Sequence, residues 1–469
     1  MGREEILAMP RRNIVSDLVD RLNVDGIEYT PVTYYYTPLT MYPRSLTPMA
    51  SSNPAQSFAL SDSETMFYVH IPFCTARCTF CPFYLDVAKS VDNNYVTGLV
   101  SQLRDISDRL SNQPGEYNIY FGGGSPNLLS VDQLDRILEA FLEYQEGSLK
   151  EVSMELHPEA AQEEGYLKEL VELGVNRVSF GLQTVNSASL RRTVRHHTVG
   201  ALDECLKEAR KLGLATNVDV MYGGFLDETL ESDKETFMHV FSRLQPTWVT
   251  GYQVCIQEGT PDFEKYQKES YRYPNTIAIL SARALFHQIA ESEGYYYLGG
   301  DYFSKDQGNP NYQEKKWGNR NAVISLGSGT YSYIIDRGKS QGNLWWSPFD
   351  TRKYLQLVRD GKAPVERSIE YTPEDIESWT IMSQLKKGRV IKNQISAGFR
   401  KKLIRLVDEG FLDSDSDGFS LSSQRTLVED LVYASLIPRS TWESFREKRK
   451  RKDYSQEAKY DWFFEQKQF

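Results

Sequence analysis

The sequence predicts an α/β protein built on a partial (βα)6 barrel, with an N-terminal extension and a small winged-helix-like α+β domain at the C-terminus. Strand-like and helix-like segments alternate from Met66 to about Gly300, and polar motifs follow the strand-like segments. Such alternation indicates βαβ units and a parallel sheet, in which active sites lie at the carboxyl ends of the strands. The six candidate strands are Met66–His70, Asn118–Phe121, Val152–Leu156, Arg177–Leu182, Thr216–Met221 and Trp248–Gln253.

The rest of the chain divides around this core, which we place at residues 61–300. Residues 1–60 are irregular and proline-containing, and residues 301–365 extend the core and complete its active site, with a strand entering a glycine turn at Val323–Gly329. Residues 366–469 form the C-terminal domain: Thr372-Pro373 opens a helix, a second helix covers Ser396–Glu409, and Phe411–Leu421 is a hairpin. Within the core, Gly200–Leu212 is a helix with Gly213 as its cap.

Composition excludes several classes of protein. The 469 residues carry 54 basic and 64 acidic side chains, a net charge of −10, which argues against nucleic-acid or membrane-surface partners. No run of ~18 apolar residues predicts a membrane span, and the charged start at Arg3, Glu4 and Glu5 does not resemble a signal peptide, so a cytoplasmic protein is expected. Five cysteines in so long a chain do not form a disulfide framework.

Three of those cysteines form a CxxxCxxC motif directly after the first strand, at Cys74, Cys78 and Cys81. Three thiolates on one tight loop can hold three irons of a [4Fe–4S] cluster. The fourth iron is then free to chelate S-adenosylmethionine (SAM) and to pass it an electron, which releases a 5′-deoxyadenosyl radical. The alternative is a zinc knuckle, but zinc needs four closed ligands, and His70 alone is near enough to be the fourth.

The lead-in to this motif, Tyr68-Val-His-Ile-Pro-Phe-Cys74, resembles the HemN-like branch of radical SAM proteins. That branch includes oxygen-independent coproporphyrinogen III dehydrogenase (HemN), the haem chaperone HemW, anaerobic haem-degrading enzymes, and class C radical SAM methyltransferases and cyclopropanases. The resemblance covers roughly residues 66–335 and implies a radical SAM barrel, a [4Fe–4S] cluster and SAM.

By the same resemblance, residues at the following strand ends bind SAM. The Gly122-Gly123-Gly124 turn precedes Ser125, where the family has threonine, and the Leu-Pro pair that the family carries after Gly223 is replaced by Gly224-Phe225. In this branch the last strands serve a second SAM, so two SAM molecules are expected. The residues assigned to SAM are Tyr68, Phe80, Gly122, Gly123, Gly124, Glu155, Gln183, Arg195, Asp219 and Gln253.

Proton transfer is assigned to Tyr222 and His196, with His197 as a further candidate. Two cysteines are set aside from the chemistry. Cys205 falls on the apolar face of its helix and is expected in the core. Cys255 alternates within a strand, which favours a structural role, although a thiol inside the barrel remains an alternative.

The choice within the branch depends on the residues after the cluster motif. HemN-like dehydrogenases carry a fourth cysteine where this chain has Phe83, and HemW-type chaperones have Cys-Asp-Phe where this chain has Cys81-Pro82-Phe83. The leading hypothesis is therefore a class C methyltransferase or cyclopropanase acting on an unsaturated or heteroaromatic natural-product intermediate. A HemW-type haem-binding chaperone, or an enzyme of tetrapyrrole oxidation or haem degradation, is the alternative. The expected partners are a small-molecule substrate and an electron donor such as flavodoxin or ferredoxin.

Overall fold

The computed structural model describes residues 64–438, apart from residues 82, 111, 160–162, 196, 225–227, 255–259, 269–275, 307–321, 337, 422–426, 428 and 437. The predictions for the N-terminal extension, His196, Phe225 and Cys255 lie outside the described residues. Within the described part of the chain, no helix is both long enough and apolar enough to cross a membrane.

Six parallel strands form the centre of a twelve-stranded sheet and follow one another in chain order. Their side chains alternate between two faces, as the pleat of a strand requires. On one face Phe67, Ile119 and Val218 are fully buried in the main hydrophobic core. All six predicted strands are confirmed, with longer bounds in most cases: β1 (Glu64–Ile71), β4 (Glu116–Gly123), β5 (Ser148–Leu156), β6 (Arg177–Gln183), β7 (Ala215–Tyr222) and β8 (Trp248–Gln253).

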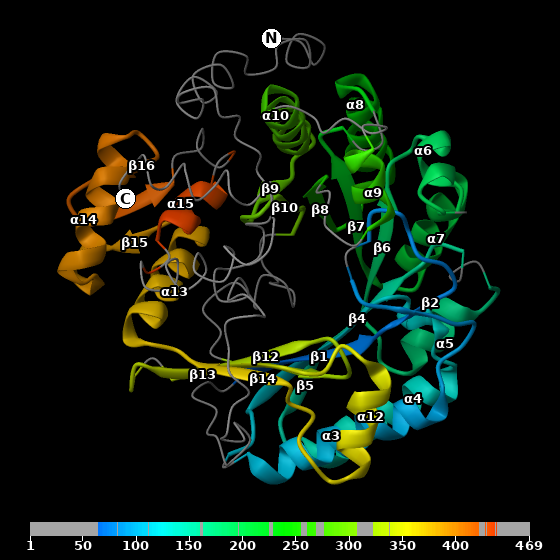
Figure 1. Cartoon of the computed structure of the whole chain (residues 1–469). Helices are drawn as coiled ribbons and strands as arrows, with labels where there is room; N and C mark the ends of the chain where they lie inside the picture. Colours follow the sequence, from blue (N-terminus) through cyan, green and yellow to red (C-terminus); the bar gives the residue numbers. More distant parts are fainter. Residues whose placement is uncertain are drawn as a thin grey trace.

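Helices cover the outer face of this sheet, which curves as an arc inside them (Figure 1). The predicted helix at residues 200–212 is confirmed as α7 (Val199–Lys211). The Thr198 side chain caps it, and Gly213 follows it with a φ of 75°. The other helices of the core are α3 (Asn93–Arg109), α4 (Val131–Tyr144), α5 (Tyr166–Glu172), α6 (Ser187–Arg192), α8 (Leu230–Met238), α9 (Pro261–Gln267) and α10 (Thr276–Ser292), with the short helical turns η1 (Pro126–Leu128) and η4 (His239–Leu244).

Further strands extend both ends of the sheet. The strand predicted before the glycine turn is confirmed as β11 (Ala322–Leu326), and the structure pairs it in parallel with β1. The strands β12 (Tyr331–Asp336), β13 (Gln341–Trp346) and β14 (Arg367–Glu370) then continue antiparallel, with α12 (Thr351–Arg359) between β13 and β14. At the other end, β10 (Tyr302–Ser304) pairs with β8, and β9 (Tyr296–Tyr297) pairs with β10.

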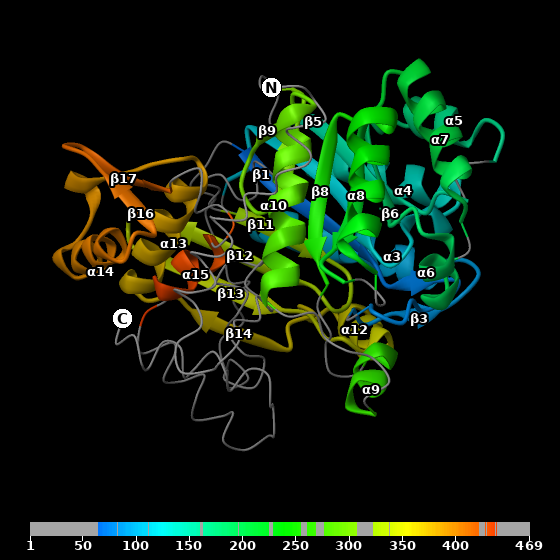
Figure 2. The ribbon, with the colours of Figure 1, turned by 90° about the horizontal axis from the view of Figure 1, so that it is seen from above.

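A smaller module of helices and a three-stranded sheet follows and lies to one side of the core (Figure 2). As predicted, Thr372 caps α13 (Pro373–Lys386) and Ser396 precedes α14 (Ala397–Asp408). The predicted hairpin is formed by β16 (Leu412–Ser414) and β17 (Gly418–Leu421), and β15 (Val390–Ile391) adds a third strand that the sequence analysis missed. Two short elements complete this part, η5 (Lys392–Gln394) and α15 (Glu429–Ser435).

On β5, β6 and β7 the inner face of the arc carries buried polar side chains, in contrast to the helix-covered face, whereas Met66 and Tyr120 on β1 and β4 belong to a second apolar cluster. Arg177 on β6 is only 2% exposed, donates to the Tyr302 hydroxyl at 2.6 Å and lies 5.0 Å over the Trp248 ring. A buried arginine needs such partners because an isolated charge is costly to desolvate. Arg177 thus connects the inner faces of β6, β8 and β10.

Candidate active site

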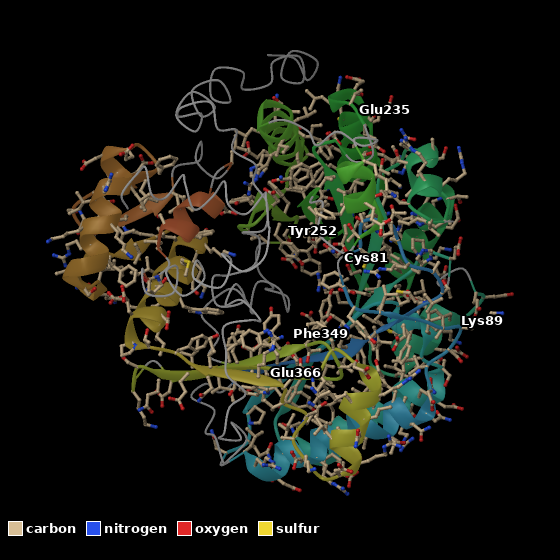
Figure 3. The ribbon with its side chains drawn as sticks, in the orientation of Figure 1. Cys81, Lys89, Glu235, Tyr252, Phe349 and Glu366 are labelled. Atoms are coloured by element: carbon tan, nitrogen blue, oxygen red, sulfur yellow. The ribbon has the colours of Figure 1, made fainter. Side chains whose placement is uncertain are left out.

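The cluster motif leaves the carboxyl end of β1, a strand in the middle of the sheet. Cys74 ends the two-residue strand β2 (Phe73–Cys74), which pairs with β3 (Asp86–Val87). The Cys81 amide donates to the Cys78 carbonyl at 3.2 Å, so the last two cysteines lie on one tight turn. All three thiols are free and half-buried. Cys81 lies at the inner side of the arc of strands, as does Tyr252 (Figure 3).

The surroundings of these thiols suit a [4Fe–4S] cluster. The Ser125 hydroxyl lies 3.4 Å from Cys74 Sγ, and the Arg195 guanidinium donates to Cys78 Sγ at 3.7 Å, so two sulfurs already receive the polar contacts that stabilise thiolate ligands. Burial raises the pKa of Cys81 to about 11 and also raises that of Cys74, so binding of iron must release protons. Among the described residues, no three His, Cys, Asp or Glu side chains are placed to hold a single metal ion, whereas a cubane offers each thiolate its own iron.

A glycine turn and an acid lie beside the cluster loop, at the ends of β4 and β5. Glu155 accepts from the Tyr120 hydroxyl at 2.9 Å and from the Gly123 amide at 3.1 Å. Gly123 has a φ of 114°, and a Cβ on it would lie 2.5 Å from the His70 ring. Only glycine therefore allows this close approach, and the predicted Gly-Gly-Gly turn and Glu155 form one unit.

The next strand brings Gln183 and Arg195 to the same edge. Gln183 ends β6 with a φ of 70°, and Arg195 Nη2 donates to the Gly181 carbonyl. A Cβ on Gly181 would lie 2.9 Å from Gln183 Nε2 and 3.0 Å from Arg195 Nη2, so the absence of a side chain lets both polar groups gather there.

Asp219 faces the inner side of the arc from β7. Its carboxylate accepts from Asn217 Nδ2 at 2.8 Å, and the same amide donates to the Ser179 hydroxyl at 2.8 Å. Burial raises the pKa of Asp219 to about 6, so the group changes charge near neutral pH. The structure therefore places Asp219 where a cation bound inside the arc could contact it.

Phe80 and Tyr68 complete the group of predicted residues near the loop. Phe80 packs against Met221 and Val254, which brings the cluster loop to the ends of β7 and β8. The Tyr68 ring stacks on Tyr120 at 6.1 Å between centroids. Phe80 thus connects the cluster loop to the ends of β7 and β8, and Tyr68 connects β1 to β4.

The predicted proton-transfer role of Tyr222 does not fit its position. Tyr222 is fully buried on the helix-covered face, where its ring stacks on Phe286 at 5.7 Å and its hydroxyl donates to Asp301. Alternation along β7 explains this: Asp219 and Tyr222 are three residues apart and therefore lie on opposite faces of the sheet. His197 is buried, and burial lowers its pKa to about 3, so it remains neutral near pH 7.

Gln253 lies beside Gly223 and is 6% exposed, and its Nε2 has no hydrogen-bond partner within the described part of the chain. Asp233, on α8, also contacts Gly223: its carboxylate accepts from the Gly223 amide at 3.2 Å. Burial raises the pKa of Asp233 to about 7. The sequence does not single out Asp233, because one acid on an ordinary helix carries no signal of burial. Nor does it predict that Arg195 contacts a cluster cysteine, since that contact joins residues 117 positions apart.

Comparison with known proteins gives one family and a consistent set of relatives. The radical SAM superfamily model matches residues 68–238. The chain is 24% identical to the heme chaperone HemW of Buchnera aphidicola over 363 residues, which are 75% of this chain and 92% of that protein. It is 27% identical to HemW of Lactococcus lactis over 354 residues, 73% and 83% of the two chains.

The chain is also similar to two coproporphyrinogen III oxidases. The oxygen-independent coproporphyrinogen III oxidase of Synechocystis is 23% identical over 300 residues, 63% of each chain. The solved structure of coproporphyrinogen III oxidase (HemN) from Escherichia coli superimposes with a TM-score of 0.68 at 21% identity, covering 80% of this chain and 90% of the other. At 21% identity, this structural similarity shows that the two chains share a fold.

Proposed function

Because the chain contains a radical SAM domain and its relatives are HemW and HemN proteins, as in the HemN-like branch, we propose that it is a HemW-type haem-binding radical SAM protein. The single observation that supports the cluster is the loop with three free, half-buried thiols, placed against a glycine turn at the carboxyl edge of the sheet. When bound there, a [4Fe–4S] cluster supplies one-electron reduction of SAM.

The chain's own residues would hold and orient SAM. Glu155 and Asp219 offer carboxylates for the ammonium or the ribose hydroxyls, and the glycine turn lets the backbone approach the ligand closely. Gln183 offers an amide to the adenosine from the end of β6. Residues fixed on rigid strands suit this task, because the reacting groups must be held within a few tenths of an ångström.

Haem as the ligand is favoured over a porphyrinogen substrate by Phe83. This side chain is 48% exposed on the cluster loop and stands where HemN-like dehydrogenases carry a fourth cysteine. The names of the relatives point the same way, since several are heme chaperones. The methyl-transfer hypothesis with two SAM molecules has no such support among these relatives.

Two measurements test the proposal at separate levels. Anaerobic reconstitution should give about four irons per chain, and this loading should be lost in Cys78→Ala but kept in Cys205→Ala, whose thiol is 2% exposed in the core. Anaerobic titration with haem should then show one saturable site on the wild type. Full iron loading without saturable haem binding would leave the cluster assignment standing and reject the chaperone.

SAM with a trideuterated methyl group tests the methyl-transfer hypothesis directly. If one deuterium appears in 5′-deoxyadenosine and S-adenosylhomocysteine is a coproduct, two SAM molecules react in one turnover and the haem proposal is wrong. Deoxyadenosine without deuterium is the outcome expected here.

A further inference from the structure

We infer that Arg195 is a positioning residue for the cluster itself: through Cys78 it raises the reduction potential of the bound [4Fe–4S] group. The inference rests on the proposed cluster site and assigns Arg195 a task that needs no SAM. The resemblance to the family gives this arginine to SAM, so the two roles make different predictions.

The backbone before Arg195 is strained in a way that directs its side chain. Helix α6 ends at Arg192, and the next turn places Val194 at a φ of 62°. A β-branched residue is disfavoured in the left-handed region, and such outliers persist where the surroundings fix them. The Arg195 amide then donates back to the Leu190 carbonyl at 2.9 Å, which holds the turn closed.

The guanidinium is held from two sides. Nη1 donates to Cys78 Sγ at 3.7 Å, and Nη2 donates to the Gly181 carbonyl on β6. The same turn meets the cluster loop a second time, where the Thr79 amide donates to the Thr193 carbonyl at 3.4 Å. Arg195 therefore has little freedom to leave Cys78, since both its backbone and its head group are tied.

A fixed positive charge on a ligand sulfur changes the energy of cluster reduction. Reduction adds one negative charge, part of which is carried by the ligand sulfurs. A guanidinium stays protonated at all working pH values and forms charge-assisted hydrogen bonds, so it stabilises the reduced state more than the oxidised state. Hydrogen bonds to the sulfurs are among the factors that set such potentials.

Among the charged residues that the structure describes near Cys78, none duplicates this effect. Arg77 donates instead to the Cys81 carbonyl at 3.4 Å and is exposed, so solvent screens it. Glu155, near the end of β5, accepts from the Gly123 amide of the neighbouring glycine turn and carries the opposite charge. His197 follows two residues after Arg195 but is neutral near pH 7, because burial lowers its pKa to about 3. Arg195 is thus the cation that the structure places on this ligand.

The test is a redox titration of the reconstituted full-length protein without SAM, followed by EPR. Arg195→Gln should keep its iron and shift the midpoint potential to more negative values, by an amount equal to at least a tenfold loss in the reduction equilibrium, or 59 mV for one electron. Arg195→Lys keeps the charge but not the fork, so its potential should lie between those of Arg195→Gln and the wild type. Arg192→Gln, an exposed arginine three residues earlier, is the matched control and should match the wild type.

Each outcome decides something. Arg195→Gln with full iron and an unchanged potential overturns the inference and leaves SAM binding as the role of the residue. Loss of iron in both Arg195 variants also overturns it, because Arg195 would then be a structural clamp on the loop. A wild type that binds no cluster rejects the proposed function instead, before Arg195 is tested.

Discussion

Gly124→Ala should impair loading of the cluster without changing any ligand. A Cβ at this position would lie 2.5 Å from the Phe73 carbonyl oxygen, 2.9 Å from that of Ile71 and 3.0 Å from Cys74 Sγ. Two of these atoms belong to the backbone that carries Cys74, so no flexible side chain can move aside. The Gly124 amide also donates to the Ile71 carbonyl at 2.8 Å, which holds the two segments together.

The size of the effect follows from these distances. An ordinary contact of 3.4 Å requires the Phe73 carbonyl to move by 3.4 − 2.5, or about 0.9 Å. Metal ligands tolerate deviations of roughly 0.2 Å, so a shift of that size at the residue before Cys74 disturbs the ligand geometry. Overpacking of this kind typically costs about 1–3 kcal/mol, and each 1.4 kcal/mol is a factor of ten in an equilibrium.

Iron per chain and the visible absorbance after anaerobic reconstitution measure the outcome. Gly200→Ala is the matched control, because a Cβ there meets nothing within 4 Å and the position lies in helix α7. This control should load iron fully and be more stable than the wild type by up to about 1 kcal/mol. If Gly124→Ala loads as much iron as Gly200→Ala, the argument that this glycine positions Cys74 is wrong.

Four further substitutions test other parts of the site. Cys74→Ala and Cys81→Ala should each abolish SAM cleavage, and activity retained in either would reject the ligand set. Asp219→Asn should keep its iron but bind SAM weakly, and wild-type affinity should fall as the pH drops through about 6, where Asp219 becomes neutral; a pH profile identical in wild type and variant contradicts this role. Because burial raises the pKa of Asp233 to about 7 from 3.8, its ionisation destabilises the fold as the pH rises through this range, by up to about 4 kcal/mol. Asp233→Asn should therefore melt above the wild type at pH 8, with a gap that narrows toward pH 5, and a constant gap would count against ionisation as the cause.

The strands and helices of the core are predictable because the spacing of apolar residues within each segment is typical of a strand or a helix. Val152–Leu156 and Thr216–Met221 are short apolar-containing runs between helical segments, and the structure places both in the parallel sheet. The strands β12, β13 and β14 after the turn at Gly327 are not predicted from the sequence, since each is specified by pairing with the strand beside it rather than by its own residues. The two-residue strand β15 escaped for the same reason.

Residue roles are harder to predict than elements, because a role depends on which face of the sheet a side chain occupies. Tyr222 and Asp219 belong to one motif, yet one lies in a buried network with Asp301 and the other faces the inner side of the arc. A motif that resembles a family identifies the strand end but does not separate the two faces. Alternation along the strand does separate them once one inward residue is known.

The ligands of the cluster loop can be recognised in a short stretch of sequence, but residues far away in the chain set their positions. The three cysteines form a motif only eight residues long, which is recognisable in the sequence. Three segments that are distant in the chain hold this motif in place. Gly124 packs against the backbone before Cys74, Arg195 contacts Cys78, and Thr79 donates to Asp262 of α9 at 3.1 Å. Each of these contacts fixes a different part of the loop, so substitutions at different contacts should change different properties of the cluster. A substitution at Gly124 should change iron loading, and a substitution at Arg195 should change the reduction potential. A variant at either position that changes both properties equally would mean that the loop moves as a single unit.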